Sequence, residues 1–166
     1  MKIYYSQRQI RDFQFEICRQ IQQSGWRPEL IVGLARGGLH PAVDLSHYFD
    51  IPMRAQAIQL RDGTVEANEE ISKMAYEGRN ILIVDDINDT GASLRHLMDL
   101  WQQTYRADDL ATWESRWHNT IRSAVLINNA DSRMFVDYAG FEINKFENPE
   151  WCVFPWEHWW SISSYR

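Results

Sequence analysis

The chain has 166 residues, a length that favours one domain with a substantial hydrophobic core. Its 17 basic and 23 acidic residues give a net charge of −6, which argues against broad binding of nucleic acid or anionic membranes. No apolar run approaches the length of a membrane span, and two cysteines are too few for a disulfide scaffold or a zinc site. We therefore expect a cytoplasmic protein with a single domain over residues 1–166.

The first half of the chain alternates between helical and strand spacing. Apolar residues at helical spacing mark a first helix that ends near Gly25: Ile10, Phe13, Ile17 and Ile21. A buried strand is expected over 30–35, LIVGLA, then a helix over 40–49 and a strand over 53–60. The stretch at about 61–76 is polar and has a turn signal at Asp62-Gly63, so it predicts a flexible loop or an ordinary surface hairpin.

The segment ILIVDDINDTGAS, residues 81–93, joins a buried strand to a helix expected over 92–103. Helix amino termini attract phosphate, and Gly91 lets the backbone approach a ligand closely. Carboxylates beside a phosphate need a positive mediator or a sugar diol, so Asp85 and Asp86 predict Mg²⁺ or direct hydrogen bonds to hydroxyls. The alternative is that these acids cap the strand and that Asp89 is a solvated turn residue.

The second half continues the alternation. The connection 105–122 is long and polar-aromatic, and Trp113 and Trp117 within it indicate an extra helix. A strand is expected over 124–127, followed by Asn128-Asn129, and four tryptophans gather within 150–160. Strands and helices that alternate in this way predict an α/β fold with an open, twisted, mostly parallel sheet flanked by helices.

The segment 81–93 resembles the ribose-phosphate-binding signature of type I phosphoribosyltransferases, which use 5-phosphoribosyl-1-pyrophosphate (PRPP). The resemblance implies that Asp85 and Asp86 bind the ribose hydroxyls, directly or through Mg²⁺. Asp89 would then be the catalytic acid near the base. The 5-phosphate would lie in the loop formed by Asp89, Thr90, Gly91, Ala92 and Ser93.

A second strand-to-helix turn, Arg36-Gly37-Gly38, resembles the pyrophosphate loop of this family, which often has a cis peptide near the position of Ala35-Arg36. Two glycines there permit positive φ and a nest of backbone N–H groups, and Arg36 adds a fixed positive charge. The family also places a mobile loop at about 61–76. Arg61 and Lys73 are further candidates for pyrophosphate contacts.

The carboxyl-terminal segment, about 141–166, resembles the base-binding hood of purine phosphoribosyltransferases of the xanthine-guanine and hypoxanthine type. Trp151 would stack on the base, and the main chain of Cys152 and Val153 would read its edge. Glu157, the acid that closes this pattern, is a candidate metal ligand through water.

The sequence departs from these enzymes at one position that bears on the base. Enzymes for 6-oxopurines place a base-reading lysine after the strand over 124–127, where this chain has Asn128 and Asn129. Lys145 does not match that position. Because an amide both donates and accepts, either asparagine could face an oxygen or an amino group of the base.

The resemblance implies a Mg²⁺-dependent transfer of the phosphoribosyl group of PRPP to a ring nitrogen of a base, with release of pyrophosphate, as in purine salvage. Hypoxanthine, guanine and xanthine are the expected bases, and a homo-oligomer, a dimer or tetramer, is the expected assembly. Two alternatives stay open: a regulator that senses PRPP or nucleotides on the same fold, and a transferase for a non-purine base.

Overall fold

The computed structural model describes residues 1–58 and 67–161. The helices are α1 Gln7–Ser24, α2 Leu39–Phe49, α3 Glu69–Tyr76, α4 Ala92–Thr104 and α5 Leu110–Arg116, with short 3-10 turns η1 Pro155–Glu157 and η2 Trp159–Ser161. The strands are β1 Lys2–Tyr4, β2 Leu30–Ala35, β3 Met53–Ala57, β4 Ile81–Asn88, β5 Ile121–Asn129, β6 Tyr138–Ile143 and β7 Trp151–Val153.

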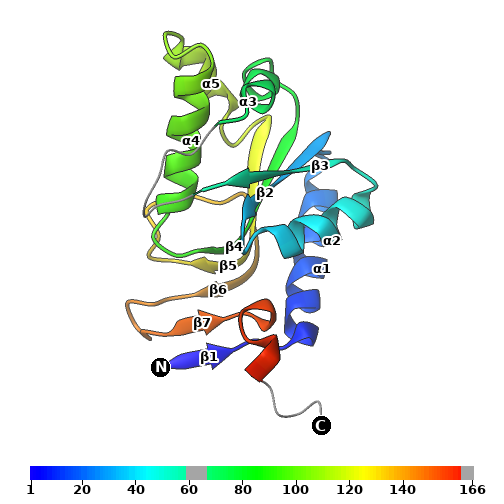
Figure 1. Cartoon of the computed structure of the whole chain (residues 1–166), viewed down its shortest axis with the longest axis vertical. Coiled ribbons are helices and arrows are strands. Elements are labelled where there is room, and N and C mark those ends of the chain that lie inside the picture. Colours follow the sequence, from blue (N-terminus) through cyan, green and yellow to red (C-terminus); the bar gives the residue numbers. More distant parts are fainter. Residues whose placement is uncertain (59–66, 162–166) are drawn as a thin grey trace.

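Five strands form one sheet in the order β3-β2-β4-β5-β6, and every neighbouring pair in it is parallel (Figure 1). The α/β fold with a parallel sheet flanked by helices is therefore confirmed. The order also shows a reversal: the chain steps from β2 outward to β3 and then returns past β2 to β4. Ligands of open α/β sheets bind at such a reversal, outside the carboxyl ends of the strands.

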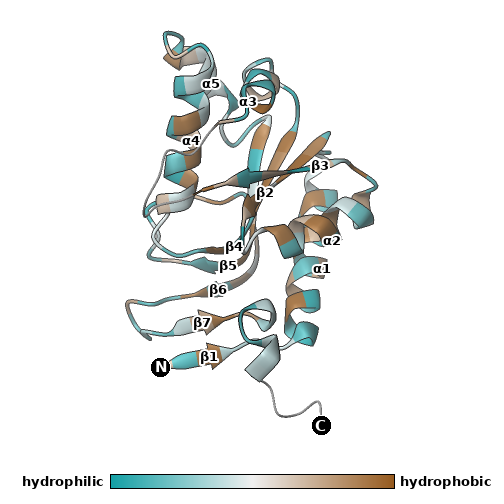
Figure 2. Ribbon diagram, in the orientation of Figure 1, coloured by the Kyte–Doolittle hydropathy of each residue, from teal (hydrophilic) through white to brown (hydrophobic). Residues whose placement is uncertain are grey.

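Two hydrophobic clusters cover the two faces of this sheet. One joins α1 and α2 to inward side chains such as Leu82 and Leu126. The other joins α3, α4 and α5 to alternate side chains such as Ile83 and Val125. The central strands carry hydrophobic stretches in Figure 2, as expected for strands buried on both faces, and β4 changes from ILIV to the polar end DDIN. The site residues at their carboxyl ends are therefore held on a rigid base.

A second, two-stranded parallel sheet pairs β1 with β7 and lies beside the main sheet (Figure 1). The backbone N–H of Tyr5 donates to the carbonyl of Val153 at 3.0 Å, and the N–H of Trp151 donates to the carbonyl of Met1 at 2.8 Å. The amino-terminal strand was not expected from the sequence, because three residues show no periodicity. It pairs with Trp151–Val153 and so holds this part of the carboxyl-terminal segment in register, while residues 162–166 lie outside the described chain.

The expected loop at about 61–76 is corrected at its carboxyl-terminal end, where Glu69–Tyr76 forms α3. The Asn68 side chain caps this helix by accepting from the N–H of Ile71, and Ile71 and Ala75 bury one face of it. Lys73 is therefore a helix residue. Arg61 lies outside the described residues, as do residues 62–66 of the predicted loop.

The extra helix in the connection 105–122 is confirmed as α5, but its tryptophans belong to the interior. Trp113 is fully buried and donates from its indole N–H to the carbonyl of Tyr105 at 2.9 Å. The Trp117 ring lies 6.2 Å from that of Trp113, within the cluster under α4. Trp113 and Trp117 therefore pack inside the domain.

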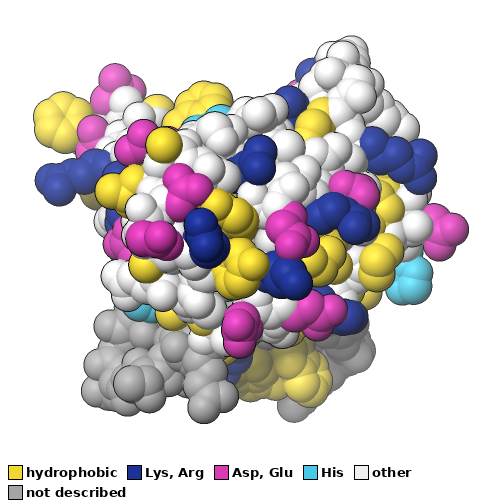
Figure 3. All heavy atoms as spheres, turned by 90° about the horizontal axis from the view of Figure 1, so that it is seen from above, with side chains coloured by type: hydrophobic (Ala, Val, Ile, Leu, Met, Phe, Trp, Pro, Cys, Tyr) yellow, Lys and Arg dark blue, Asp and Glu magenta, His cyan; other side chains and the backbone are white. Residues whose placement is uncertain are grey.

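The surface carries charges of both signs. On the face seen in Figure 3, acidic and basic side chains are interspersed without a continuous basic stripe. No helix among residues 1–58 and 67–161 combines the length and the apolarity needed to cross a membrane.

Candidate active site

A cavity of about 320 Å³ opens at the carboxyl ends of β2 and β4, the adjacent strands at the reversal of strand order. Two segments distant in the sequence line most of it, the turn after β2 and the turn after β4. Its lining includes Arg36, Gly37, Asp85, Asp86, Asp89, Thr90, Gly91, Ala92 and Ser93. Parallel pairing of β2 with β4 therefore brings together the two turns for which the sequence separately predicted anion binding.

The turn after β2 has the predicted cis peptide between Ala35 and Arg36. Its glycines have another reason than the one expected, since neither Gly37 nor Gly38 has positive φ. A Cβ on Gly37 would lie 1.9 Å from Oδ2 of Asp86. Glycine is needed here because the turn passes directly against the acids of β4.

Asp85 and Asp86 belong to the last part of β4, and their environment opposes ionisation. Asp85 is buried, and burial together with the charge of Asp86 raises its pKa well above the usual range. Burial also raises the pKa of Asp86. A hydrogen bond with the side chain of Asp85 and one from the N–H of Ile87 partly offset this increase. Two carboxylates held this way favour a bound cation.

The donor set at this position consists of carboxylate oxygens. In the part of the chain that the structure describes, no group of three or more His, Cys, Asp or Glu residues is placed to hold a metal alone. Mg²⁺ typically uses one or two protein carboxylates and completes its shell with water and substrate oxygens. Asp85 and Asp86 fit that arrangement.

The turn after β4 forms an open loop before α4. Gly91 has φ 88°, and a Cβ there would also meet Cγ of Met134 at 2.5 Å. The Thr90 hydroxyl accepts from the N–H of Ala92 at 3.3 Å. Since α4 begins at Ala92, its first backbone N–H groups lie at the edge of the cavity, where a phosphate would be favoured.

Asp89 has a partner that was missed in the sequence. The ammonium of Lys145 lies 2.9 Å from Oδ2 of Asp89. Lys145 comes from the connection between β6 and β7, and only its position six residues before Trp151 could have pointed to the site. The structure thus supplies a lysine beside Asp89 from an unexpected segment.

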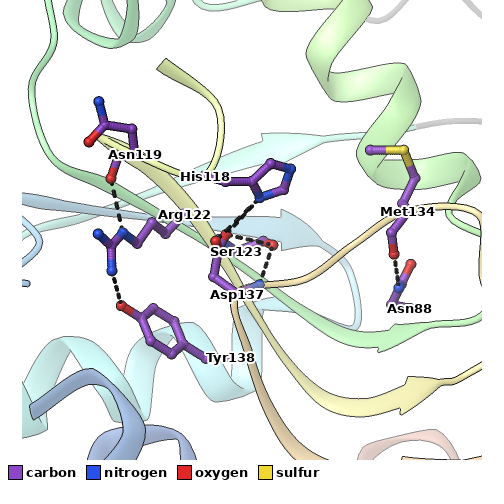
Figure 4. Close-up of polar contacts among 8 residues, drawn as sticks. All are labelled: Asn88, His118, Asn119, Arg122, Ser123, Met134, Asp137 and Tyr138. Carbon is purple, nitrogen blue, oxygen red and sulfur yellow. Dashed lines mark hydrogen bonds and ion pairs between the residues drawn. The ribbon is translucent and has the colours of Figure 1, made fainter. Parts of the chain in front are cut away.

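Asn128 and Asn129 have other partners than a base. Asn128 donates to the Glu142 carboxylate at 2.9 and 3.2 Å and accepts from Asn88, which also donates to the carbonyl of Met134 (Figure 4). Asn129 is buried and donates to the carbonyl of Asp89 at 2.9 Å. Its Oδ1 accepts from the N–H groups of Asp131 and Lys145. These amides tie the ends of β4, β5 and β6 together, so base reading by either remains a prediction without support here.

The carboxyl-terminal segment reaches the same region. Trp151 is 64% exposed, which leaves its ring free for stacking, while Cys152 and Val153 are buried. Glu157 raises the pKa of Asp86 through its negative charge, so its carboxylate is near the acids of β4. That carboxylate also accepts from the N–H of Phe154 at 2.8 Å.

Lys73 stands apart from these residues. It is exposed on α3, 3.9 Å from the carboxylate of Glu77, and does not line the cavity. A pyrophosphate contact by Lys73 is therefore not supported by its position.

The family model of the phosphoribosyl transferase domain matches residues 3–158. The chain belongs to this family. The match extends from β1 to His158, the residue after η1, so it includes both turns at the cavity and most of the carboxyl-terminal segment.

Relatives of this phosphoribosyltransferase domain agree with that placement. The hypoxanthine-guanine phosphoribosyltransferase of Dictyostelium discoideum is 24% identical over 86% of this chain and 81% of that protein. That of Aquifex aeolicus (strain VF5) is 28% identical over 60% of this chain and 61% of that protein. Among solved structures, the purine phosphoribosyltransferase of Pyrococcus horikoshii Ot3 superposes with a TM-score of 0.68 at 26% identity, covering 94% of each chain.

Proposed function

We propose that this chain transfers the 5-phosphoribosyl group of PRPP to a ring nitrogen of a purine base and releases pyrophosphate. The observation that carries this proposal is that the turns after β2 and β4 face one cavity at the strand-order reversal. PRPP has phosphate groups at both ends of one sugar, and the two turns supply two anion sites around a pair of acids. The purine relatives support the choice of base.

In this proposal the two turns hold the substrate and orient its reacting carbon. Arg36 and the backbone of Gly37 and Gly38 bind the pyrophosphate, and the residues from Asp89 to Ser93 bind the 5-phosphate. The ribose hydroxyls lie at Asp85 and Asp86. Binding at both ends of the sugar fixes the carbon between them, which lowers the entropic part of the barrier.

Asp85 and Asp86 would hold Mg²⁺, and Glu157 would contribute through water. When bound, the ion neutralises charge on the leaving pyrophosphate. Arg36 adds a fixed positive charge on the same leaving group. The raised pKa values of the two acids fit this assignment, because a cation restores their ionised form.

The reaction breaks the bond between the ribose carbon and pyrophosphate and forms a bond from that carbon to the ring nitrogen. The ribose develops positive charge as pyrophosphate leaves, as in glycoside chemistry. Asp89 would accept or position the proton of the base. Trp151 would stack on the ring, and the main chain at Cys152 and Val153 would meet its edge.

The test is a pyrophosphate-release assay with PRPP, Mg²⁺ and a panel of hypoxanthine, guanine, xanthine, adenine and pyrimidine bases. Release with one or more purines is the expected result. Tight PRPP binding with no release from any base would overturn the proposal and favour a PRPP-sensing regulator. Release with a pyrimidine alone would favour a non-purine transferase.

We also propose that the enzyme is a cytoplasmic homo-oligomer, a dimer or tetramer. Exposed aromatic side chains of Phe15 and Tyr48 border a shallow cavity between α1 and α2, and exposed apolar surface of this kind is common at subunit contacts. Sedimentation of the purified protein tests this, and a monomer at micromolar concentration would contradict it.

A further inference from the structure

The phosphate loop, residues 89–93, is held from behind through its carbonyl groups. Asn129, the last residue of β5, donates from its side-chain amide to the carbonyl of Asp89 at 2.9 Å. The backbone N–H of Arg133, in the connection that follows β5, donates to the carbonyl of Thr90 at 3.4 Å. A neighbouring segment therefore sets the orientation of two consecutive peptide groups of the loop.

The orientation of each carbonyl also fixes the N–H of the same peptide group. In a planar trans peptide the two groups point in opposite directions. The contact between Asn129 and the carbonyl of Asp89 therefore directs the N–H of Thr90 away from β5. The contact with Arg133 does the same for the N–H of Gly91. Asn129 and Arg133 border a hollow that is separate from the cavity between the turns after β2 and β4, so these N–H groups are directed toward the cavity side of the loop.

Asn129 is itself held by several partners. It is buried, with 6% of its surface exposed, and its Oδ1 accepts from the N–H groups of Asp131 and Lys145 at 3.3 and 3.1 Å. Its amide nitrogen is the group that donates to Asp89. A buried amide paired at both its oxygen and its nitrogen has little freedom to rotate, and its loss would leave buried backbone groups unpaired. Asn129 thus transmits the fixed position of β5 to the loop.

A second buried amide, Asn88 at the end of β4, holds the connection after β5. It donates to the carbonyl of Met134 at 2.8 Å (Figure 4) and to Oδ1 of Asn128 at 2.7 Å, and it accepts from the hydroxyl of Ser132 at 3.0 Å. A Cβ on Gly91 would lie 2.9 Å from the backbone nitrogen of Met134. The connection therefore lies directly against the loop and supports it from the side opposite the cavity.

We propose that Asn129 is a positioning residue for the 5-phosphate: it holds the carbonyl of Asp89 so that the N–H groups of the loop face the phosphate of PRPP. This inference rests on the proposed function and adds a residue from β5 to its phosphate site. It also separates Asn129 from base reading, because an effect on the phosphate is the same for every base. Loss of a buried hydrogen bond that leaves its acceptor unpaired corresponds to about 10- to 100-fold in affinity.

The experiment compares the wild type with Asn129→Leu, which keeps the branched shape of the side chain, removes its donor and adds no charge. We expect the Kd of ribose 5-phosphate and the KM of PRPP to rise about 10- to 100-fold. The Kd of pyrophosphate with Mg²⁺ should not change, because the turn after β2 is untouched. The ratio of kcat/KM between different bases should also stay constant.

The matched control is Asn80→Leu, which removes the same kind of contact at the opposite end of β4. The Asn80 amide donates to the carbonyl of Arg27 at 3.0 Å. This variant should lower Tm and leave the Kd of ribose 5-phosphate and of pyrophosphate unchanged. General destabilisation is thereby distinguished from a specific effect on the phosphate loop.

Two results would overturn the inference. One is an unchanged Kd of ribose 5-phosphate in Asn129→Leu, and the other is an equal loss of affinity for ribose 5-phosphate and pyrophosphate. If Asn129→Leu does not fold, Asn129→Ser is measured in its place, since its shorter side chain withdraws the donor from Asp89 and adds no charge. A changed ratio between bases with an unchanged Kd of ribose 5-phosphate would return Asn129 to base reading.

The proposed function fails separately, because binding of ribose 5-phosphate is measured without any reaction. If no base releases pyrophosphate but Asn129→Leu weakens ribose 5-phosphate alone, the role of Asn129 stands in a protein that binds PRPP without transfer. If bases react and the variant binds ribose 5-phosphate as the wild type does, the transferase activity stands and the role of Asn129 is wrong.

Discussion

Asp85 is a carboxylic acid placed where its charge is disfavoured. Burial raises its pKa first, and the neighbouring charge of Asp86 raises it further. A raised native pKa means that the neutral acid is favoured in the fold. The contribution of protonated Asp85 to the free energy of unfolding is complete below the unfolded pKa of about 4. It is lost as pH rises through the higher native pKa. The unliganded protein therefore loses stability toward neutral pH at this residue.

Replacement of Asp85 by Asn removes this cost. Without Mg²⁺ or PRPP at pH 7.5, we expect Asp85→Asn to be more stable by about 1 kcal/mol, a rise in Tm of about 2–4 °C for a chain of this size. The gain should shrink toward pH 4, where both proteins carry a neutral group. Thermal unfolding over a pH series measures it, and a gain that does not vary with pH would contradict the explanation. PRPP binding should be lost in the same variant.

Asp89 is the residue of the phosphate loop for which a chemical role is also proposed. We expect Asp89→Ala to lower turnover by roughly 10²–10⁴-fold. PRPP binding should be largely intact, because the other residues of the phosphate loop remain. Single-turnover kinetics and a PRPP binding isotherm separate the two effects. Turnover equal to that of the wild type would remove Asp89 from the mechanism.

At the scale of elements, the site depends on how closely two strand-to-helix turns approach each other. The turn after β2 has room for no side chain at Gly37, because Asp86 of β4 lies against it. The far end of β5 is tied independently: the Asp137 carboxylate accepts from the N–H of Ser123 at 2.8 Å and lies 3.2 Å from Nδ1 of His118 (Figure 4). Polar contacts thus fix β5 at its amino-terminal end as well as at its carboxyl end.

Gly37→Ala tests the approach of the two turns. The new methyl group must displace Asp86 or the turn, and a misplacement near 1 Å at a reacting site can cost about 10²-fold. We expect kcat/KM with PRPP to fall by about that factor. The fall in Tm should be smaller than that caused by Gly25→Ala. Steady-state kinetics and thermal unfolding are the two measurements.

Gly25→Ala is the matched control. Gly25 ends α1 with φ 70°, and a Cβ there meets no atom within 4 Å. Alanine in this left-handed conformation should cost about 1–2 kcal/mol of stability without changing kcat/KM. If Gly37→Ala behaves like Gly25→Ala, close approach is not the reason for glycine at Gly37.

At the scale of the whole molecule, PRPP would bridge the turns after β2 and β4. Mg²⁺ would neutralise the buried acids of β4. A ligand that binds only the folded state at 100 times its Kd adds about 2.7 kcal/mol to the free energy of unfolding. We expect Tm to rise by several degrees with PRPP and Mg²⁺ together, and by clearly less with PRPP and EDTA. Equal shifts in both conditions would argue against metal at Asp85 and Asp86.

Local patterns in the sequence were enough for the α/β class, β2, the start of β4 and the two strand-to-helix turns that follow these strands. Short-range rules govern these features: an apolar run such as ILIV must be buried, and a turn such as Asp89 to Ser93 leads directly into its helix. The cis peptide was expected from the family resemblance alone. The end of the predicted loop was wrong at α3, because the cap at Asn68 and the apolar spacing of Ile71 and Ala75 outweigh the polar composition.

Contacts between distant segments were decided only by tertiary structure. No periodicity shows that β2 and β4 are neighbours, that three residues of β1 pair with β7, or that Trp113 is interior. Lys145 illustrates the limit best, since its match to Asp89 depends on Asn129, a buried amide on a third segment. Side-chain types and local spacing specify which chemistry is present, whereas strand order and the packing of loops determine which groups meet.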